Sequence, residues 1–214
     1  MDGAARHRLV KAAAWGAALA PAALLLLDAA RHRLGANPIE EVLNRLGFWT
    51  LTFLSASLAP TPLHRWLSLN WPLRVRRLLG VTAFAYAALH FSWYLGVDQF
   101  FDLKAVGADV VKRPFITVGF AALLVLLPLA VTSTDGWVRR LGFARWKALH
   151  RLAYVAALLG VVHFLWRVKA DKQKPTLFAV VVVALLLLRL RRPGRRAPPP
   201  DHSGRLVDTL PGRK

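Results

Sequence analysis

Several uninterrupted apolar runs, each close to twenty residues long, set the strongest limit on how this chain can fold. A helix needs about 20 consecutive apolar residues to cross the hydrocarbon core of a bilayer, and these runs approach that length. Strands that cross a membrane would alternate polar and apolar residues, a pattern these runs do not show. The hydrophobic content of 56% also exceeds the ~45–50% usual for a soluble domain. We therefore predict an all-α, polytopic membrane protein whose helices form a bundle.

The apolar runs and the polar gaps between them predict about six membrane-spanning helices in one domain over residues 1–192. The expected spans are 9–28, 47–66, 78–97, 114–133, 148–166 and 175–190. In the second span, the prolines of Pro60-Thr61-Pro62 interrupt the helix, so we expect it to end early and continue as an interfacial segment ahead of Trp66. From Arg189 onward the chain is expected to be disordered, and residues 193–214 form a basic tail outside the domain.

Basic residues are concentrated in alternate gaps between the predicted spans, and they account for most of the formal net charge of +19. They gather in the N-terminus, 65–77, 139–151 and the tail, whereas 31–45, 98–113 and 167–174 are closer to neutral. Because lysine and arginine accumulate on the cytoplasmic side of membrane proteins, both termini are predicted to be cytoplasmic in a bacterial inner membrane. The clusters lie between apolar runs, so the expected partner is the lipid bilayer and no nucleic-acid partner is expected.

Two of the seven histidines are predicted to meet inside the membrane. His90 lies in the third expected span and His163 in the fifth, at depths that differ by only about 4–5 Å at 1.5 Å per residue. Two imidazoles on facing helices are suitable axial ligands for a six-coordinate haem iron that transfers electrons. The alternative is that each imidazole only forms a hydrogen bond to a neighbouring helix. The chain has no cysteine, so it cannot build an iron–sulfur cluster or a thiolate metal site by itself.

A second layer of polar residues is expected about 20 Å lower, because His150 lies 13 residues before His163. Arg76, 14 residues before His90, lies at roughly the same depth and could pair with a haem propionate or stand beside the sixth coordination position. Thirteen residues turn an ideal helix by about 220°, so His150 and His163 share a face only if that helix is distorted. Arg76 could instead be a basic anchor at the cytoplasmic surface.

The four remaining histidines fall in termini or loops, where a solvated side chain is expected. They are His7, His32, His64 and His202.

Taken together, several motifs over residues 37–192 resemble the haem-binding membrane subunits of bacterial protein-methionine-sulfoxide reductase systems, a ferric-reductase-like transmembrane family. The motifs are Arg74-Val-Arg76-Arg77-Leu78-Leu79-Gly80 followed by His90, Arg113-Pro114-Phe115-Ile116-Thr117-Val118-Gly119, Thr132-Ser133-Thr134, and Trp146 with Leu149-His150, Tyr154, His163 and Trp166. The resemblance implies a six-helix bundle similar to the membrane half of the NADPH oxidases, which carry two histidines on each of two helices. This chain departs from that pattern at one place, where it has Arg76.

The resemblance further implies that the protein passes electrons from the quinone pool or a cytoplasmic flavin reductase to MsrP, a periplasmic molybdopterin enzyme that repairs oxidised methionines. It implies haem b, with one or two haems, and associates FMN with the family. The chain has no glycine-rich nucleotide-binding motif after a strand, so it is expected to be an electron-transfer subunit rather than the catalytic one. Two alternatives stay open: a haem-containing metal-ion or quinone reductase with another partner, and a small proton-coupled transporter.

Overall fold

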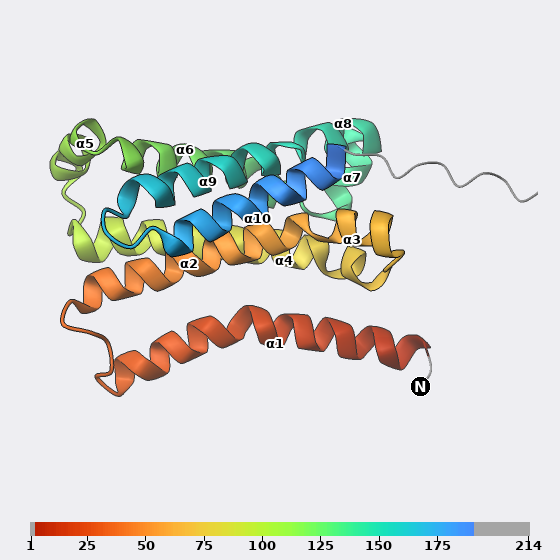
Figure 1. Cartoon of the computed structure of the whole chain (residues 1–214), viewed down its shortest axis with the longest axis horizontal. Helices are drawn as coiled ribbons and strands as arrows, with labels where there is room; N and C mark the ends of the chain where they lie inside the picture. Colours follow the sequence, from red (N-terminus) through yellow and green to blue (C-terminus); the bar gives the residue numbers. More distant parts are fainter. Residues whose placement is uncertain (1–2, 191–214) are drawn as a thin grey trace, which may run out of the picture.

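The computed structural model describes residues 3–190, and this part of the chain is built of helices with no strand (Figure 1). In chain order the helices are α1 (Gly3–Ala30), α2 (Pro38–Leu58), α3 (Pro60–Leu67), α4 (Trp71–Trp93), the π-helical turn η1 (Tyr94–Asp98), α5 (Leu103–Lys112), α6 (Pro114–Val131), α7 (Asp135–Leu141), α8 (Phe143–Leu149), α9 (Leu152–Arg167) and α10 (Gln173–Leu190). The prediction of an all-α bundle is confirmed. The tail 193–214 lies outside the described residues.

Helix starts follow local sequence signals. Pro38 and Pro114 occupy the first position of α2 and α6, where the missing proline N–H is not needed and the fixed φ suits a helix. Side-chain oxygens cap three helix starts. Asn37 accepts from the Glu40 N–H in the first turn of α2, Asp102 accepts from two N–H groups at the start of α5, and Thr134 accepts from one at the start of α7. These signals place the ends of the long helices independently of the apolar pattern.

Five helical segments are long and apolar enough to cross a membrane, which confirms a multi-pass membrane protein. They are Arg8–Ala30, Trp71–Asp98, Pro114–Val131, Phe143–Arg167 and Gln173–Leu190. They correspond to the first and to the third to sixth of the expected spans.

The second expected span, 47–66, is wrong in its position. The helix there, α2, begins nine residues earlier at Pro38 and ends at Leu58, and the short α3 follows from Pro60. The early end and the separate segment before Trp66 were expected from the proline pair. The early start was not, because the first turns of α2 carry Glu40 and Glu41 and do not look like a membrane helix.

α2 tolerates these polar residues because it lies inside the bundle. It packs chiefly along α4 and also contacts α1, α9 and α10. Eight of its residues are buried, including Leu51, Phe53, Leu54 and Leu58. A helix surrounded by other helices faces little lipid, so it does not need the uniformly apolar surface of a peripheral span.

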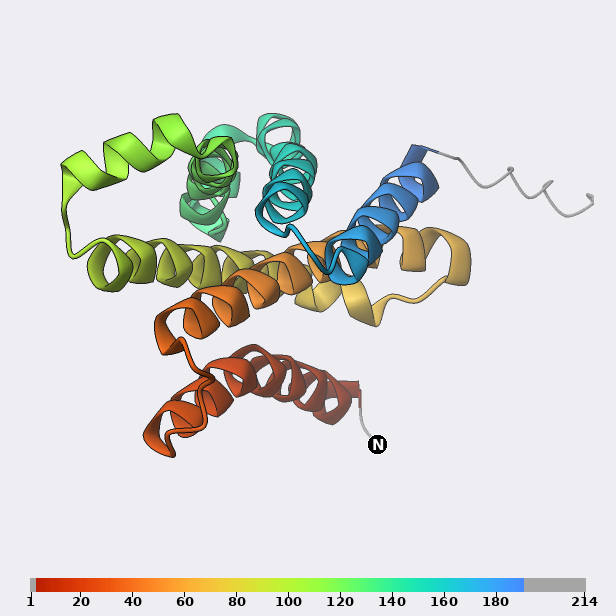
Figure 2. The same ribbon diagram turned by 60° about the vertical axis from the view of Figure 1, so that its left-hand side comes forward.

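Polar segments collect at two ends of the bundle (Figures 1 and 2). One end holds the N-terminal end of α1, the short helices α3, α7 and α8, and the C-terminal end of α10; we call it the basic end. The opposite end holds α5 and the connections α1–α2 and α9–α10. This is the grouping of segments that the charge pattern predicted. The two ends of the described chain lie on the same side of the bundle.

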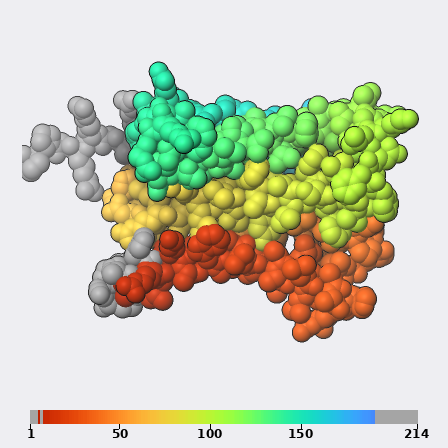
Figure 3. Space-filling model, turned by 180° about the vertical axis from the view of Figure 1, so that it is seen from behind, coloured from red at the N-terminus to blue at the C-terminus, as the bar shows by residue number. Residues whose placement is uncertain are grey.

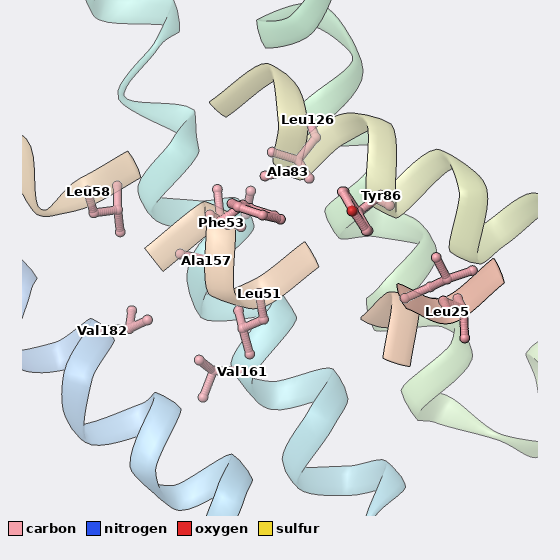
Figure 4. Packing of buried hydrophobic residues seen from close by; sticks show 14 of the residues in the cluster. Leu25, Leu51, Phe53, Leu58, Ala83, Tyr86, Leu126, Ala157, Val161 and Val182 are labelled. Carbon is pink, nitrogen blue, oxygen red and sulfur yellow. The ribbon is translucent and has the colours of Figure 1, made fainter. Parts of the chain in front are cut away.

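The core joins all six long helices, as the labelled residues of Figure 4 show. Its most buried members include Leu58 on α2, Ala83 on α4, Ala156 and Ala157 on α9, and Val182 on α10. The three alanines have essentially no exposed surface, so the backbones of α4 and α9 approach their neighbours closely there. Small residues serve this purpose in membrane bundles, where packing contacts replace the hydrophobic effect as the driving force.

α1 forms an outer layer against α4, with α6 on the far side of α4 (Figure 3). Pro21 lies inside α1 and interrupts its backbone hydrogen bonding, because proline has no N–H to donate. One residue later, the Tyr86 hydroxyl on α4 accepts from the Ala22 N–H at 3.0 Å and donates to the Ala18 carbonyl at 2.9 Å. It thus stands between two groups that would bond to each other in an unbroken helix and ties α1 to α4.

Candidate functional site

His90 on α4 and His163 on α9 face each other inside the bundle. Their ring centroids are 6.2 Å apart and their planes are nearly perpendicular, at 87°. His90 belongs to the last turn of α4, and His163 lies four residues before the end of α9, so the pair is near the end opposite the basic end. The depth argument expected these two residues to meet, and the structure brings them together.

Backbone carbonyls on two further helices hold both imidazoles. His90 Nδ1 lies 3.0 Å from the carbonyl oxygen of Leu43 on α2, and His163 Nδ1 lies 2.7 Å from that of Phe115 on α6. A carbonyl can only accept, so Nδ1 of each ring is the donor. Each Nε2 then carries the lone pair, and no hydrogen bond to either Nε2 is formed within residues 3–190. This is the arrangement of metal-binding histidines, in which the second nitrogen is fixed by an outer partner.

Two glycines provide the space that the imidazoles occupy. A Cβ atom on Gly47 of α2 would lie 3.2 Å from Cε1 of His90. On Gly119 of α6 it would lie 2.5 Å from Nδ1 of His163, closer than atoms of real side chains approach. Each ring therefore packs onto the bare backbone of a neighbouring helix. The sequence argument missed both glycines as part of the site, although Gly119 closes one of the motifs quoted for the resemblance.

The spacing of the two rings fits a single metal ion between them. An imidazole nitrogen binds a metal at about 2 Å, and the ring centroid lies roughly 1 Å behind that nitrogen, so two axial imidazoles require centroids about 6 Å apart. The observed separation is 6.2 Å. Within residues 3–190 no third protein ligand joins the two nitrogen donors, and such a pair suits a haem iron, whose other four ligands come from the porphyrin.

His150 lies where the fifth apolar segment breaks. α8 ends at Leu149 and α9 begins at Leu152, with a turn between them. The helix is therefore interrupted next to His150, and a distortion of this kind was the condition for His150 and His163 to share a face. The His150 ring stacks on Trp146 with centroids 4.0 Å apart, and its Nδ1 lies 3.0 Å from the Trp146 carbonyl oxygen. Its Nε2 is buried and has no hydrogen-bond partner in the described chain.

Arg76 lies in the second turn of α4 and His150 directly follows α8, so both residues are at the basic end of the bundle. A further arginine at this end, Arg189, was not expected to take part in the fold and is a correction to the predicted start of the tail. It is the penultimate residue of α10 and is half-buried. Its guanidinium donates to the Tyr154 hydroxyl and, at 2.6 Å, to the Leu58 carbonyl, while its buried Nε has no partner in residues 3–190.

The sequence offered one signal for Arg189, namely a charge within the last turn of an otherwise apolar run. Arg76 also lies within electrostatic range of Arg189. The basic end thus holds two buried nitrogen atoms without partners, His150 Nε2 and Arg189 Nε, among positive charges. Of the histidines expected to be solvated, His32 and His64 are exposed, His202 lies outside the described residues, and the His7 side chain is likewise not described.

Comparison with known families matches this architecture to a described membrane component. A family model described as "Ferric reductase like transmembrane component" matches residues 46–161, more than half of the chain. The matched range begins in α2 and ends in α9, so it contains His90 and His150 and stops two residues before His163.

Curated relatives match over nearly their whole lengths. The chain is 52% identical to "Protein-methionine-sulfoxide reductase heme-binding subunit MsrQ" of Rhodospirillum rubrum, over 90% of this chain and 95% of that protein. It is 50% identical to the protein of the same name from Herminiimonas arsenicoxydans, over 85% and 84% of the two chains. The one from Deinococcus radiodurans is 51% identical, over 83% and 87%.

Fold and family model together define the class, a ferric-reductase-like transmembrane protein. Within this class, the identity to the curated relatives shows that the chain belongs to the MsrQ family.

Proposed function

We propose that this protein is a haem b electron carrier in which His90 and His163 would hold the haem iron. The observation that carries the proposal is the pair of facing imidazoles 6.2 Å apart, each with Nδ1 fixed by a carbonyl and Nε2 free. The relatives named as heme-binding subunits support the same cofactor. When bound, a haem with two axial imidazoles supplies one-electron transfer without an open coordination position for substrate.

The residues of the chain do three things for this chemistry. The Leu43 and Phe115 carbonyls orient the rings and raise the basicity of the ligating nitrogens. Gly47 and Gly119 let the rings recede against α2 and α6. The surrounding helices keep water away, which favours electron transfer over side reactions by lowering the local dielectric response.

The partners follow from the family and the charge pattern. The names of the relatives place them in a methionine-sulfoxide reductase system, which supports a periplasmic MsrP as electron acceptor. If the basic end is cytoplasmic in a bacterial inner membrane, the His90–His163 site lies near the periplasm, where a soluble acceptor can collect the electron. The donor is the quinone pool or a cytoplasmic flavin reductase, and FMN stays an expectation of the family resemblance.

A second centre at the basic end is part of the proposal. The buried, unpartnered Nε2 of His150 supports a ligand role, and Arg76 supplies charge for a propionate. His150 and Arg76 would then hold a second haem at the basic end, on the opposite side of the bundle from His90 and His163.

Absorption spectra and haem content of the purified protein test the haem proposal. Protein from haem-replete cells should be red, with a b-type spectrum. His90→Ala or His163→Ala should abolish the part of that spectrum that comes from the haem between these two residues. His64→Ala is the matched control, since His64 is exposed and should leave the spectrum unchanged. A colourless wild-type protein would overturn the proposal. Two haems per chain, falling to one in His150→Ala or Arg76→Ala, support the second centre; one haem unaffected by either change rejects it.

Partner assays separate this function from the alternatives. Reduction of a periplasmic molybdopterin reductase should stop when this chain is deleted and resume when it is restored. A metal-ion reductase would instead reduce metal ions without that partner. A proton-coupled transporter would show pH-dependent flux in liposomes whether or not haem is bound.

A further inference from the structure

Arg167 lies directly beyond the His90–His163 pair. It is the last residue of α9 and follows His163 by four residues, so the two side chains share one face of the helix, one turn apart. Its side chain is 28% exposed, which is well covered for an arginine at a helix end.

In this structure Arg167 holds a single carboxylate. Its Nη2 donates to Glu40 Oε1 on α2 at 3.1 Å, and the Glu40 side chain is 55% exposed. Such a pair between partly solvated groups contributes little to stability. A guanidinium has five N–H donors, so this contact leaves most of its capacity free.

Glu40 does not depend on Arg167. It lies in the first turn of α2, where the helix dipole favours a negative charge, and its second oxygen accepts from the Asn37 amide at 3.4 Å. Three other carboxylates at this end are paired elsewhere: Asp28 and Glu41 with Arg45, and Asp109 with Arg113. Arg167 can therefore exchange Glu40 for a stronger anionic partner at little cost.

Haem b carries two propionate carboxylates at one edge of the porphyrin. A carboxylate brought beside a bundle interior needs a cation and hydrogen-bond donors to offset its desolvation, and a guanidinium supplies both in bidentate form. We propose that Arg167 binds a propionate of the haem held by His90 and His163, and that Glu40 releases it when haem enters. This inference rests on the proposed haem function and adds a carboxylate-binding residue to it.

The test compares two porphyrins that differ only in these carboxylates. Haem b and its dimethyl ester are titrated into full-length protein purified from haem-limited cells, in a His150→Ala background so that uptake at the basic end does not contribute. Arg167→Gln should weaken haem b binding roughly tenfold or more, the loss expected for a charge-assisted hydrogen bond. It should leave binding of the ester unchanged, which also shows that the variant is folded.

Glu40→Gln is the matched control. If Glu40 only competes for Arg167, this variant binds haem b at least as tightly as the wild type. If the two residues merely brace α9 against α2, Glu40→Gln weakens haem b binding as Arg167→Gln does, and both variants lose the ester to the same extent. That result overturns the inference. Wild-type protein that takes up neither porphyrin would instead overturn the proposed function itself.

Discussion

At the scale of single residues, the site depends on two glycines that have no side chain as much as on the two histidines. Gly119 has no side chain at the point where the His163 ring lies, and its helix supplies the Phe115 carbonyl that fixes the same ring. The two features are four residues apart on α6, one turn of the helix. One helix face therefore both admits the imidazole and orients it.

Gly119→Ala should displace the His163 ring and lower the haem content. The added Cβ would lie 2.5 Å from Nδ1 of the ring, so the ring must move and lose its bond to Phe115. The haem bound between His90 and His163 should fall to less than half of its wild-type amount. Gly47→Ala, where the Cβ would lie 3.2 Å from the His90 ring, should have a smaller effect in the same direction.

The matched control is Gly80→Ala on α4, where a Cβ would meet nothing within 4 Å. A glycine inside a helix costs about 1 kcal/mol relative to alanine, so this change should raise stability slightly and leave haem content unaltered. Equal haem content in all three variants would contradict the role assigned to Gly119.

At the scale of helices, polar side chains repair the interruptions that proline creates. The Tyr86 hydroxyl is the clearest case, since it satisfies both the Ala22 N–H and the Ala18 carbonyl around Pro21. Buried backbone groups without partners cost free energy in a membrane as they do in a protein core. The hydroxyl thus fixes how α1, an otherwise peripheral helix, sits on α4.

Tyr86→Phe should loosen α1 without emptying the haem site. It keeps the ring that packs against Phe53 but leaves two backbone groups unpaired, a loss of about 1–3 kcal/mol. Amide hydrogen exchange around Ala22 should become faster, while haem content stays at the wild-type level. Tyr94→Phe, which removes a hydroxyl bonded to Asp109 instead, should leave exchange in α1 unchanged.

A second connection between elements is sensitive to pH. Arg77 on α4 donates to Asp135 at the start of α7 at 2.6 Å, and this hydrogen bond lowers the pKa of the Asp135 carboxyl below its ordinary value of 3.8. A lowered folded-state pKa stabilises the protein above the unfolded pKa and is lost as the pH falls through the folded value. The acid side of a thermal-stability profile should therefore flatten slightly in Asp135→Asn. The effect is small because both side chains are largely exposed, and a profile identical to the wild type would contradict it.

Helix identity was easier to predict than helix position. Apolar length alone located the peripheral spans, because lipid contact demands apolar residues on most of the helix surface. It misplaced α2, because a helix inside the bundle does not need apolar residues on most of its surface. The N-terminus of α2 is determined instead by the Asn37 cap and Pro38. The break at His150 was not predicted as such. The sequence argument said only that His150 and His163 could share a face if the helix were distorted, because a turn of two residues inside an apolar run has no strong signal in the sequence.

At the scale of the whole molecule, the sequence could predict which residues meet across the bundle when this depends only on their depth in the membrane. His90 and His163 were expected to meet because their distances along the chain place them at one level, and they do. The carbonyls and the glycines come from helices α2 and α6, whose rotation about their axes the sequence does not specify. Arg189 was missed for a related reason, because its partners Tyr154 and Leu58 lie on other helices.

The orientation of the bundle is the property on which the direction of electron flow depends, and the chain offers a clean way to measure it. It has no cysteine, so a single introduced cysteine reports its own location. Lys104 on α5 and Arg145 on α8 are exposed at the two opposite ends of the bundle. If the basic end is cytoplasmic, a membrane-impermeant maleimide should label Lys104→Cys in intact cells and Arg145→Cys only after permeabilisation. The reverse pattern would place the His90–His163 pair on the cytoplasmic side, and a periplasmic acceptor could then no longer take its electron from that site directly.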